Sequence, residues 1–289
     1  MPLSSNDAPT FKGALCAIVD VRACVGQKGG VGGPVATDGN GGFMQPIQYL
    51  RSLIYTVQVY AAMAVMGLWF APQAMLTDDG ALRACRAWCR YALWSARWIV
   101  GIRSEIRGAV PQGEVMIAAK HQSFLDIILL VSVLPRPRFI MKRELVRMPV
   151  LGWFALRIGC IPVDRGKRGA AIMQMLKDVD AGRIAAGQLI IYPQGTRVAP
   201  GAITPYKTGT AILYEQLNQP CVPVAVNVGL FWPRHGILKR KGLAVAEFLE
   251  TIPPGVERGA FAADLEARIE ARSDALMMEA GWSPKLSTA

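Results

Sequence analysis

The chain has 289 residues, of which 52% are hydrophobic, and it carries 32 lysine and arginine residues against 21 aspartate and glutamate residues. This length and apolar content exclude a largely disordered chain and allow one large domain or two small ones with a sizeable core. The net charge of +11 predicts a polyanionic partner, and the positive mean hydropathy of +0.27 favours anionic lipid over nucleic acid, because a membrane-surface protein needs long apolar runs.

The six cysteines are scattered along the chain, without the CxxC pairs or dense even spacing of a disulfide scaffold, and this predicts a reducing compartment. Cys85 and Cys89 lie four residues apart, but only two histidines, His121 and His235, are present to complete a tetrahedral set of ligands. We therefore expect no metal.

Residues 1–43 contain a glycine-rich tract from Gly26 to Gly42 without sustained periodicity, which predicts a flexible extension. The tract matches neither the glycine spacing of nucleotide-binding loops nor the ordered regions of a secretory signal. Met44 directly precedes the first strongly patterned segment, and we hypothesise that the native protein starts there. A peptide mapped upstream of Met44 would contradict this.

Residues 44–107 are expected to form a membrane-associated helical region. No charged residue occurs from Ser52 to Thr77, and the run from Leu53 to Ala71 approaches the roughly 20 apolar residues that a bilayer core requires. Pro72, and then Asp78, Asp79 and Gly80, are expected to interrupt this helix. The pattern fits both a helix that spans the membrane and one that enters a single leaflet.

A second helical segment is expected from Leu82 to Ile102, with arginines on one stripe and tryptophans beside it. This combination suits the headgroup region of a membrane. The residues concerned are Arg83, Arg86, Arg90, Arg97, Trp88, Trp94 and Trp98. Two buried helices of a soluble domain are the alternative interpretation of the helical pair.

Residues 108–289 are expected to form an α/β domain, since short apolar strands alternate with helical stretches. The predicted fold class is thus α/β, with a mixed sheet that is flanked by helices and preceded by the membrane-associated helical pair. Strands are expected at 115–119, 139–141, 160–163, 188–192, 222–227 and 243–249, and helices near 124–133, 150–158, 169–186, 207–217 and 261–280.

His121 and Asp126 follow a predicted strand and open an apolar helix, in the sequence KHQSFLDIILL. The two side chains can meet if His121 lies in the turn and Asp126 in the first helical turn. A carboxylate there can fix the histidine tautomer for proton abstraction, and it can also complete a capping box with Ser123 at the N-cap. The two roles are compatible, and both stay open.

Three further segments follow or form predicted strands. GCIPVDR, which ends at Arg165, offers cations to a phosphate or forms a solvated basic turn. IIYPQGTR, which ends at Arg197, is either a ligand-binding turn or an ordinary strand exit with a surface arginine. CVPVAVN, which ends at Asn227, is by default a strand packed in the core.

In order and wording, these four segments resemble the sequence blocks of the 1-acylglycerol-3-phosphate acyltransferase (lysophosphatidic acid acyltransferase) family. Those blocks are an HxxxxD motif, a GxxxxxR block, a PEGTR block and an apolar VPV segment. The resemblance covers about residues 115–230, and the hydrophobic N-terminal region also fits it.

The resemblance implies a role for each matching residue. It makes His121 the general base and Asp126 its orienter. It assigns the substrate phosphate to Arg165 and Arg197, with Lys142 of MKREL as a further candidate, the substrate loop to Gln194, Gly195 and Thr196, and the acyl path to Val222, Pro223 and Val224.

Two positions depart from the family pattern. Lys120 stands where the family usually has asparagine, and Gln194 stands where it usually has glutamate. Glutamine keeps its hydrogen-bonding capacity but removes a negative charge beside the site for an anionic substrate. The effect is either mild or the mark of a different acceptor headgroup.

The activity implied is that of a 1-acylglycerol-3-phosphate O-acyltransferase, which makes phosphatidic acid for phospholipid biosynthesis. The expected partners are lysophosphatidic acid, acyl-CoA or acyl-carrier protein as thioester donor, and anionic membrane lipid; nucleic acid, metal and other cofactors are not expected. Oxyanion donors are expected among the backbone N–H groups at the helix opening after His121.

We expect the protein to be membrane-associated with its catalytic domain at the cytoplasmic face, which in a bacterium is the face of the inner membrane. The open alternatives are an acyltransferase for another lysolipid or for glycerol 3-phosphate, and a non-catalytic basic membrane-binding protein. Acyl-chain length and oligomeric state do not follow from the sequence.

Overall fold

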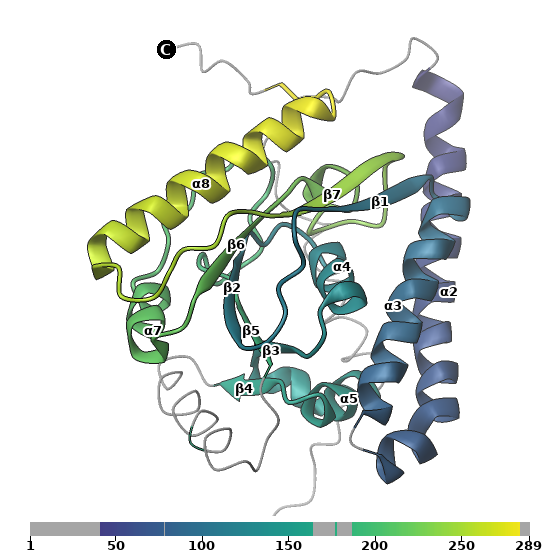
Figure 1. Ribbon diagram of the computed structural model, residues 1–289. Coiled ribbons are helices and arrows are strands. Elements are labelled where there is room, and N and C mark those ends of the chain that lie inside the picture. The colour runs from purple at the N-terminus through teal and green to yellow at the C-terminus, as the bar shows by residue number, and fades with distance from the viewer. Residues whose placement is uncertain (1–40, 78, 164–176, 178–186, 284–289) are drawn as a thin grey trace, which may run out of the picture.

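The computed structural model describes residues 41–77, 79–163, 177 and 187–283, in which a seven-stranded sheet packs between helices and a long helical pair runs along one side (Figure 1). The candidate Arg165, the glycine-rich tract up to residue 40 and, except for Lys177, the predicted helix near 169–186 lie outside the described residues. The predicted α/β class, with a mixed sheet, flanking helices and a preceding helical pair, is confirmed.

The sheet has the strand order β1-β7-β6-β2-β5-β3-β4. Strands β6, β2, β5, β3 and β4 run parallel to one another, whereas β7 pairs with β6 in the antiparallel sense and β1 is parallel to β7. The bounds are β1 Ile102–Arg107, β2 Val115–Ala119, β3 Pro137–Lys142, β4 Ile161–Val163, β5 Gln188–Ile191, β6 Cys221–Val226 and β7 Gly242–Phe248.

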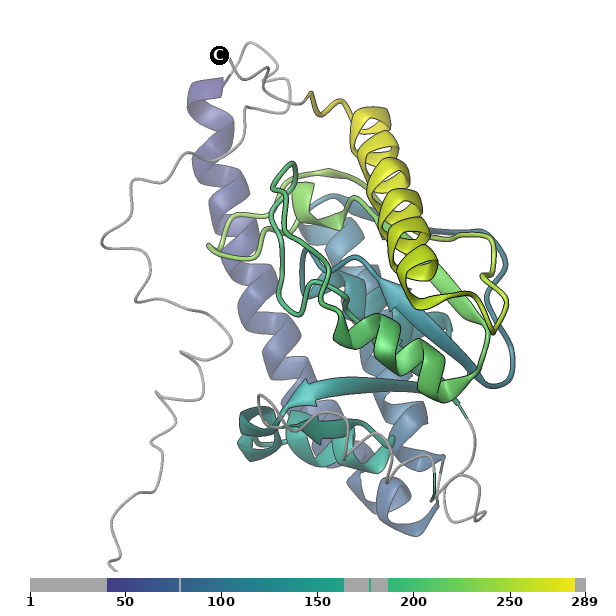
Figure 2. The same ribbon diagram turned by 90° about the vertical axis from the view of Figure 1, so that its left-hand side faces the viewer.

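Alternation along the central strand β2 divides the core into two layers. Val115, Ile117 and Ala119 belong to the core layer that includes residues of α2, α3 and α4, while Met116 and Ala118 belong to the layer that includes residues of α7 and α8. Every residue of β2 is buried, as expected for a strand covered on both faces. Figure 2 shows α8 lying along the outside of its layer. The helices of the domain are α4 Leu125–Val133, α5 Leu151–Arg157, α7 Gly209–Leu217 and α8 Arg258–Glu279, with short 3-10 turns η2 Arg143–Arg147 and η3 Val228–Leu230.

Strand β1 was not among the predicted strands. Its sequence, IRSEIR, has few apolar residues, because β1 forms an edge of the sheet and exposes Arg103 and Ser104. It nevertheless pairs with β7 along its whole length. The sheet therefore begins within residues 44–107, the region that was expected to be helical.

The helical pair consists of α2, Gly41–Leu76, and α3, Gly80–Ile99. Pro72, the first of the two expected interruptions, lies inside α2, and the helix continues to Leu76, shortly before Asp79 and Gly80. A proline removes one backbone donor from a helix but does not always end it. The second helix ends at Ile99, before the predicted Ile102, because the chain passes there into β1.

Polar contacts hold the two helices together. The Tyr55 hydroxyl donates to the Ala92 carbonyl at 3.1 Å, and the Trp88 indole N–H donates to the Val59 carbonyl at 3.0 Å. Tyr55 also meets Trp232 edge-on, with ring centroids 5.5 Å apart. Helix α2 is thus joined both to α3 and to the α/β domain.

The other side of α2 is exposed and apolar. By length and composition, the stretch Gln45–Leu76 could cross a membrane, with a mean hydropathy of 1.6 and only 11% of its most apolar window buried. Leu68 is 75% exposed and Trp69 is 80% exposed. Unlike the buried helix of the alternative interpretation, α2 is therefore largely exposed.

Candidate active site

The predicted site segments gather at one edge of the sheet. Strands β2, β5 and β3 are parallel neighbours, so their carboxyl ends lie side by side. His121 follows β2, the Tyr192–Arg197 segment follows β5, and Lys142 ends β3. The Val198 N–H donates to the His121 carbonyl at 2.7 Å, which joins the turn after β2 directly to the segment after β5. This is the edge at which open α/β sheets place ligands.

His121 and Asp126 meet at this edge. The His121 Nδ1 lies 3.0 Å from Asp126 Oδ1 and 3.1 Å from Oδ2. Asp126 is fully buried, whereas the His121 side chain is 14% exposed. Because the carboxylate holds Nδ1, the other ring nitrogen, Nε2, is the one that is left to take up a proton.

The same carboxylate also caps the start of α4. Asp126 Oδ2 accepts from the backbone N–H groups of Gln122 at 2.9 Å and Ser123 at 2.8 Å, and the Ser123 hydroxyl accepts from Leu125 N–H at 3.1 Å. The N-cap is Phe124, one residue after the expected Ser123. Capping and orienting the histidine therefore coexist. The N–H groups of Gln122 and Ser123 thus already donate to Asp126, and the expectation of oxyanion donors near this helix opening stays a prediction.

Tyr192 completes the surroundings of the histidine, and nothing in the sequence singled it out beyond its place at a strand end. Its ring stacks on His121 with centroids 3.9 Å apart, and its hydroxyl donates to Asp126 Oδ1 at 3.3 Å. Burial, followed by the charge of Asp126, raises the pKa of Tyr192 well above its usual value. The tyrosine thus stays protonated and acts as a donor that orients the carboxylate.

Arg197 is partly buried near this pair. Burial lowers the pKa of its guanidinium, the neighbouring Arg234 adds to the lowering, and Asp126 and Tyr60 of α2 oppose it. Arg234 donates to the Arg197 carbonyl at 2.9 Å. The two arginines therefore lie close to each other, and Arg197 lies close enough to Asp126 to interact with it. Arg234 was missed because it follows η3, far along the chain, and only the fold brings it here.

The loop that carries Arg197 turns at Gly195. This residue has φ +68°, and a Cβ on it would come within 2.8 Å of Lys207 Nζ. Its N–H donates to the Tyr192 carbonyl at 2.8 Å, which closes the turn. Thr196 is exposed next to it, so the loop offers a hydroxyl to solvent.

Lys120 and Gln194 meet at helix α8. Lys120 forms an ion pair with Glu270, and its side chain is only 3% exposed. Gln194 Nε2 donates to Glu270 Oε1 at 3.4 Å, and the Tyr206 hydroxyl donates to the same oxygen at 2.9 Å. The buried Gln194 Oε1 accepts no hydrogen bond from the residues that the structure describes.

The remaining candidates are placed differently. Lys142 is exposed at the end of β3. Val222, Pro223 and Val224 are buried in β6, and the two valines belong to the core layer that includes residues of α4. In position they are core residues, as the default interpretation had it.

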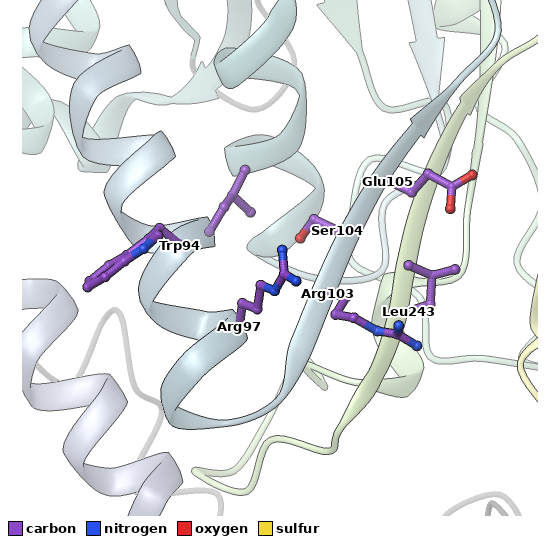
Figure 3. Close-up of a pocket in the computed structure, with 7 residues that line it drawn as sticks. Trp94, Arg97, Arg103, Ser104, Glu105 and Leu243 are labelled. Carbon is purple, nitrogen blue, oxygen red and sulfur yellow. The ribbon is translucent and has the colours of Figure 1, made fainter.

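A hollow of about 430 Å³ lies elsewhere, between α3, β1 and β7, and none of the predicted catalytic residues lines it (Figure 3). Trp94 and Arg97 contribute to it from α3, and Arg103 and Glu105 contribute from β1. Trp94 is 61% exposed. The hollow thus presents two guanidinium groups and an exposed indole near the helical pair.

Comparison with known proteins identifies the family. The family model described as Acyltransferase matches residues 101–227. The chain is 30% identical over 203 residues to the 1-acyl-sn-glycerol-3-phosphate acyltransferase of Pseudomonas aeruginosa, covering 69% of this chain and 79% of that protein. It is 32% identical over 142 residues to the mouse 1-acyl-sn-glycerol-3-phosphate acyltransferase alpha, covering 48% of this chain and 50% of that protein.

The fold also has a solved counterpart. The crystal structure of the 1-acyl-sn-glycerophosphate (LPA) acyltransferase PlsC from Thermotoga maritima matches with a TM-score of 0.64 at 19% identity, over 79% of this chain and 98% of that chain. The ordered blocks, the histidine and aspartate that meet at the sheet edge, and the extent of the Pseudomonas match agree. The chain belongs to the 1-acyl-sn-glycerol-3-phosphate acyltransferase family.

Proposed function

We propose that the protein transfers an acyl chain from a thioester, acyl-CoA or acyl-carrier protein, to the sn-2 hydroxyl of 1-acyl-glycerol 3-phosphate. The product is phosphatidic acid for phospholipid biosynthesis. The observation that carries the proposal is the pairing of His121 with a fully buried Asp126, beside partly buried Arg197, in a member of this family.

The histidine acts as general base. His121 Nε2 takes the proton of the acceptor hydroxyl while its oxygen attacks the thioester carbonyl carbon. The tetrahedral intermediate then collapses, the C–S bond breaks, and the leaving thiolate takes the proton back from the imidazolium. Asp126 stabilises the imidazolium and keeps Nδ1 protonated, so Nε2 remains free for this exchange. No metal or other cofactor takes part.

The arginines hold the phosphate. Arg197 lies near the carboxylate of Asp126 and Arg234 lies beside Arg197, so a phosphate bound between the two guanidinium groups gains charge-assisted hydrogen bonds from both. We assign Arg165 and Lys142 to the same phosphate from the family resemblance alone. Binding the headgroup at this point turns recognition into positioning of the hydroxyl.

The acceptor arrives from the membrane. Tyr60 of the apolar helix α2 is among the groups that act on Arg197, so the helical pair borders the site. We propose that α2 is embedded in the bilayer with the catalytic domain at the cytoplasmic face. We further propose that Arg97 and Arg103 meet anionic headgroups there.

The experiment compares membranes that contain the wild type or His121→Ala, supplied with lysophosphatidic acid and oleoyl-CoA or oleoyl-carrier protein, with the lipid products resolved. Phosphatidic acid formed by the wild type but not by the variant is the expected result. The two donor arms decide between the thioesters.

A wild type that forms no phosphatidic acid with either donor refutes the assignment. Parallel incubations with glycerol 3-phosphate and with other lysophospholipids then test the alternative acceptors. Binding of the wild type and of His121→Ala to anionic vesicles is expected to be equal, because the histidine lies in the site and not on the apolar face of α2.

A further inference from the structure

The two positions at which this chain departs from its family pattern converge on one carboxylate. Lys120 pairs with Glu270, and Gln194 donates to the same side chain. Lys120 and Glu270 are separated by 150 positions in the sequence and Gln194 and Glu270 by 76. The two departures are therefore coupled in space, although each looks independent in the sequence.

We propose that Glu270 is a positioning residue for acyl transfer, an inference that rests on the proposed function above. Its carboxylate holds the segment before His121 and the loop that leads to Arg197 in one fixed arrangement. In this chain α8 thus supplies the negative charge that the family pattern places at position 194.

The burial of Lys120 makes the carboxylate necessary. Its ammonium group is almost completely removed from solvent, and a buried charge without a partner carries a large desolvation cost. Lys120 is also the residue directly before His121, and its own N–H donates to the Val224 carbonyl at 3.0 Å. A shift of the lysine side chain therefore acts on the backbone that carries the general base.

The hydrogen bond of Gln194 shows why carboxylates at position 194 and at Glu270 would repel each other. A glutamate at 194 would bring a second carboxylate to within hydrogen-bonding distance of Glu270 Oε1, where the glutamine now donates. Asp274, one turn further along α8, also interacts electrostatically with Lys120 and Glu270. Burial and Glu270 raise the pKa of Asp274, whereas Lys120 lowers it. With a glutamate at position 194, three carboxylates would share the one buried ammonium group of Lys120.

Helix α8 is a rigid support for such a role. Phe261, Leu265 and Ile269 are completely or almost completely buried in the core layer beneath the sheet. Glu270 directly follows Ile269 in α8, so its backbone is fixed by that packing. Tyr206, which donates to Glu270, adds a third loop to the same anchor.

The test is a charge exchange, measured as kcat and KM for lysophosphatidic acid in detergent. Glu270→Gln is expected to lower kcat/KM by roughly 10- to 100-fold, because small misplacements of reacting groups have effects of this size. Gln194→Glu alone is expected to raise KM, since it adds negative charge beside the phosphate site. The double variant Glu270→Gln with Gln194→Glu returns the carboxylate to the other side of Lys120 and is expected to recover to within about fivefold of the wild type.

Three comparisons keep the test decisive. Asp264→Asn removes an acidic group of α8 that pairs with Arg268 on the helix surface, and it is expected to leave kcat/KM unchanged. If Glu270→Gln alone does not fold, Lys120→Asn with Glu270→Gln removes both members of the ion pair and is expected to fold with reduced kcat. Thermal unfolding of each variant separates loss of structure from loss of turnover.

Wild-type turnover in Glu270→Gln, or a double exchange that is no better than the sum of its single variants, overturns the inference. Either result leaves the proposed acyl transfer standing, provided that the wild type forms phosphatidic acid. Failure of the wild type itself would instead refute the proposed function.

Discussion

Replacing Asp126 by asparagine separates the catalytic role of this carboxylate from its capping role. The substitution keeps the shape of the side chain but changes one oxygen into an NH₂ donor. In the native protein, Oδ2 accepts from the N–H groups of Gln122 and Ser123, while Oδ1 lies 3.0 Å from His121 Nδ1 and accepts from the Tyr192 hydroxyl. In the variant the NH₂ group therefore faces either the backbone N–H groups at the start of α4 or His121.

The geometry decides the choice. If the NH₂ faces the helix, it meets two backbone donors, and each buried donor left unsatisfied costs about 1–3 kcal/mol. If it faces His121, it meets the Nδ1–H and the Tyr192 hydroxyl, and both conflicts can be relieved, because the imidazole can move its proton from Nδ1 to Nε2 and the hydroxyl can rotate to accept. The second orientation is favoured. It preserves the cap but blocks the nitrogen that has to accept the substrate proton.

The expected result is therefore a large loss of rate with a small loss of stability. We expect kcat to fall on the order of 10²- to 10⁴-fold, which corresponds to roughly 3–5 kcal/mol in the activation free energy. The assay measures phosphatidic acid formation at saturating lysophosphatidic acid and oleoyl-CoA, with Tm measured on the same preparation. Asp126→Asn with kcat within about threefold of the wild type would refute the reasoning and reduce Asp126 to a helix cap.

Three further predictions concern charged groups elsewhere. Arg197→Gln is expected to raise KM for lysophosphatidic acid by roughly 10- to 100-fold, because a charge-assisted hydrogen bond to phosphate contributes about 1.5–3 kcal/mol, and Arg197→Lys is expected to recover part of it. Lys239→Met is expected to raise Tm at pH 7, because burial lowers the pKa of this lysine from 10.5 to about 8. Burying the charged lysine thus lowers the free energy of unfolding by at most about 3 kcal/mol. Arg97→Gln with Arg103→Gln is expected to increase the mole fraction of phosphatidylglycerol that mixed micelles need for half-maximal activity, since each basic residue near an anionic surface contributes about 1 kcal/mol.

The lowered pKa of Lys239 determines the pH range over which the difference in Tm is expected to change. Below about pH 8 the lysine is protonated in the folded and unfolded states, and the full burial penalty is present. Between about pH 8 and 10.5 the unfolded state binds more protons, so wild-type stability gains on the variant as pH rises. The difference in Tm between Lys239→Met and the wild type is thus expected to shrink over this range. A difference that is constant with pH would contradict the prediction, as would an unchanged KM for Arg197→Gln or an unchanged lipid requirement for the arginine pair.

Local pattern was sufficient for the parts of the fold with strong apolar periodicity. All six strands predicted beyond residue 108 correspond to observed strands, β2 to β7, because each is a short apolar run that the sheet buries. Strand β1 could not be found in this way, since as an edge strand it carries Arg103, Glu105 and Arg107 and is held by pairing with a segment far along the chain. Pro72 does not interrupt α2, because a single proline does not stop a helix whose other contacts are intact.

The candidate site shows the same division. His121 and Asp126 lie five residues apart, so the sequence alone could show how they meet. Tyr192, Arg234 and Glu270 come from separate elements, and their approach to the site depends on sheet order and helix packing. No spacing in the sequence signals such a convergence. Arg165 falls outside the described residues, and its role stays a prediction.

Helix α2 has a practical consequence for making this protein. Gln48 donates to the carbonyls of Val100 and Lys239, and Tyr55 and Val59 are buried against the α/β domain. Deleting the helix to obtain a soluble enzyme would uncover this apolar surface and leave buried carbonyls without donors. Shortened versions are therefore expected to aggregate, and purification has to carry the whole helix in detergent or lipid.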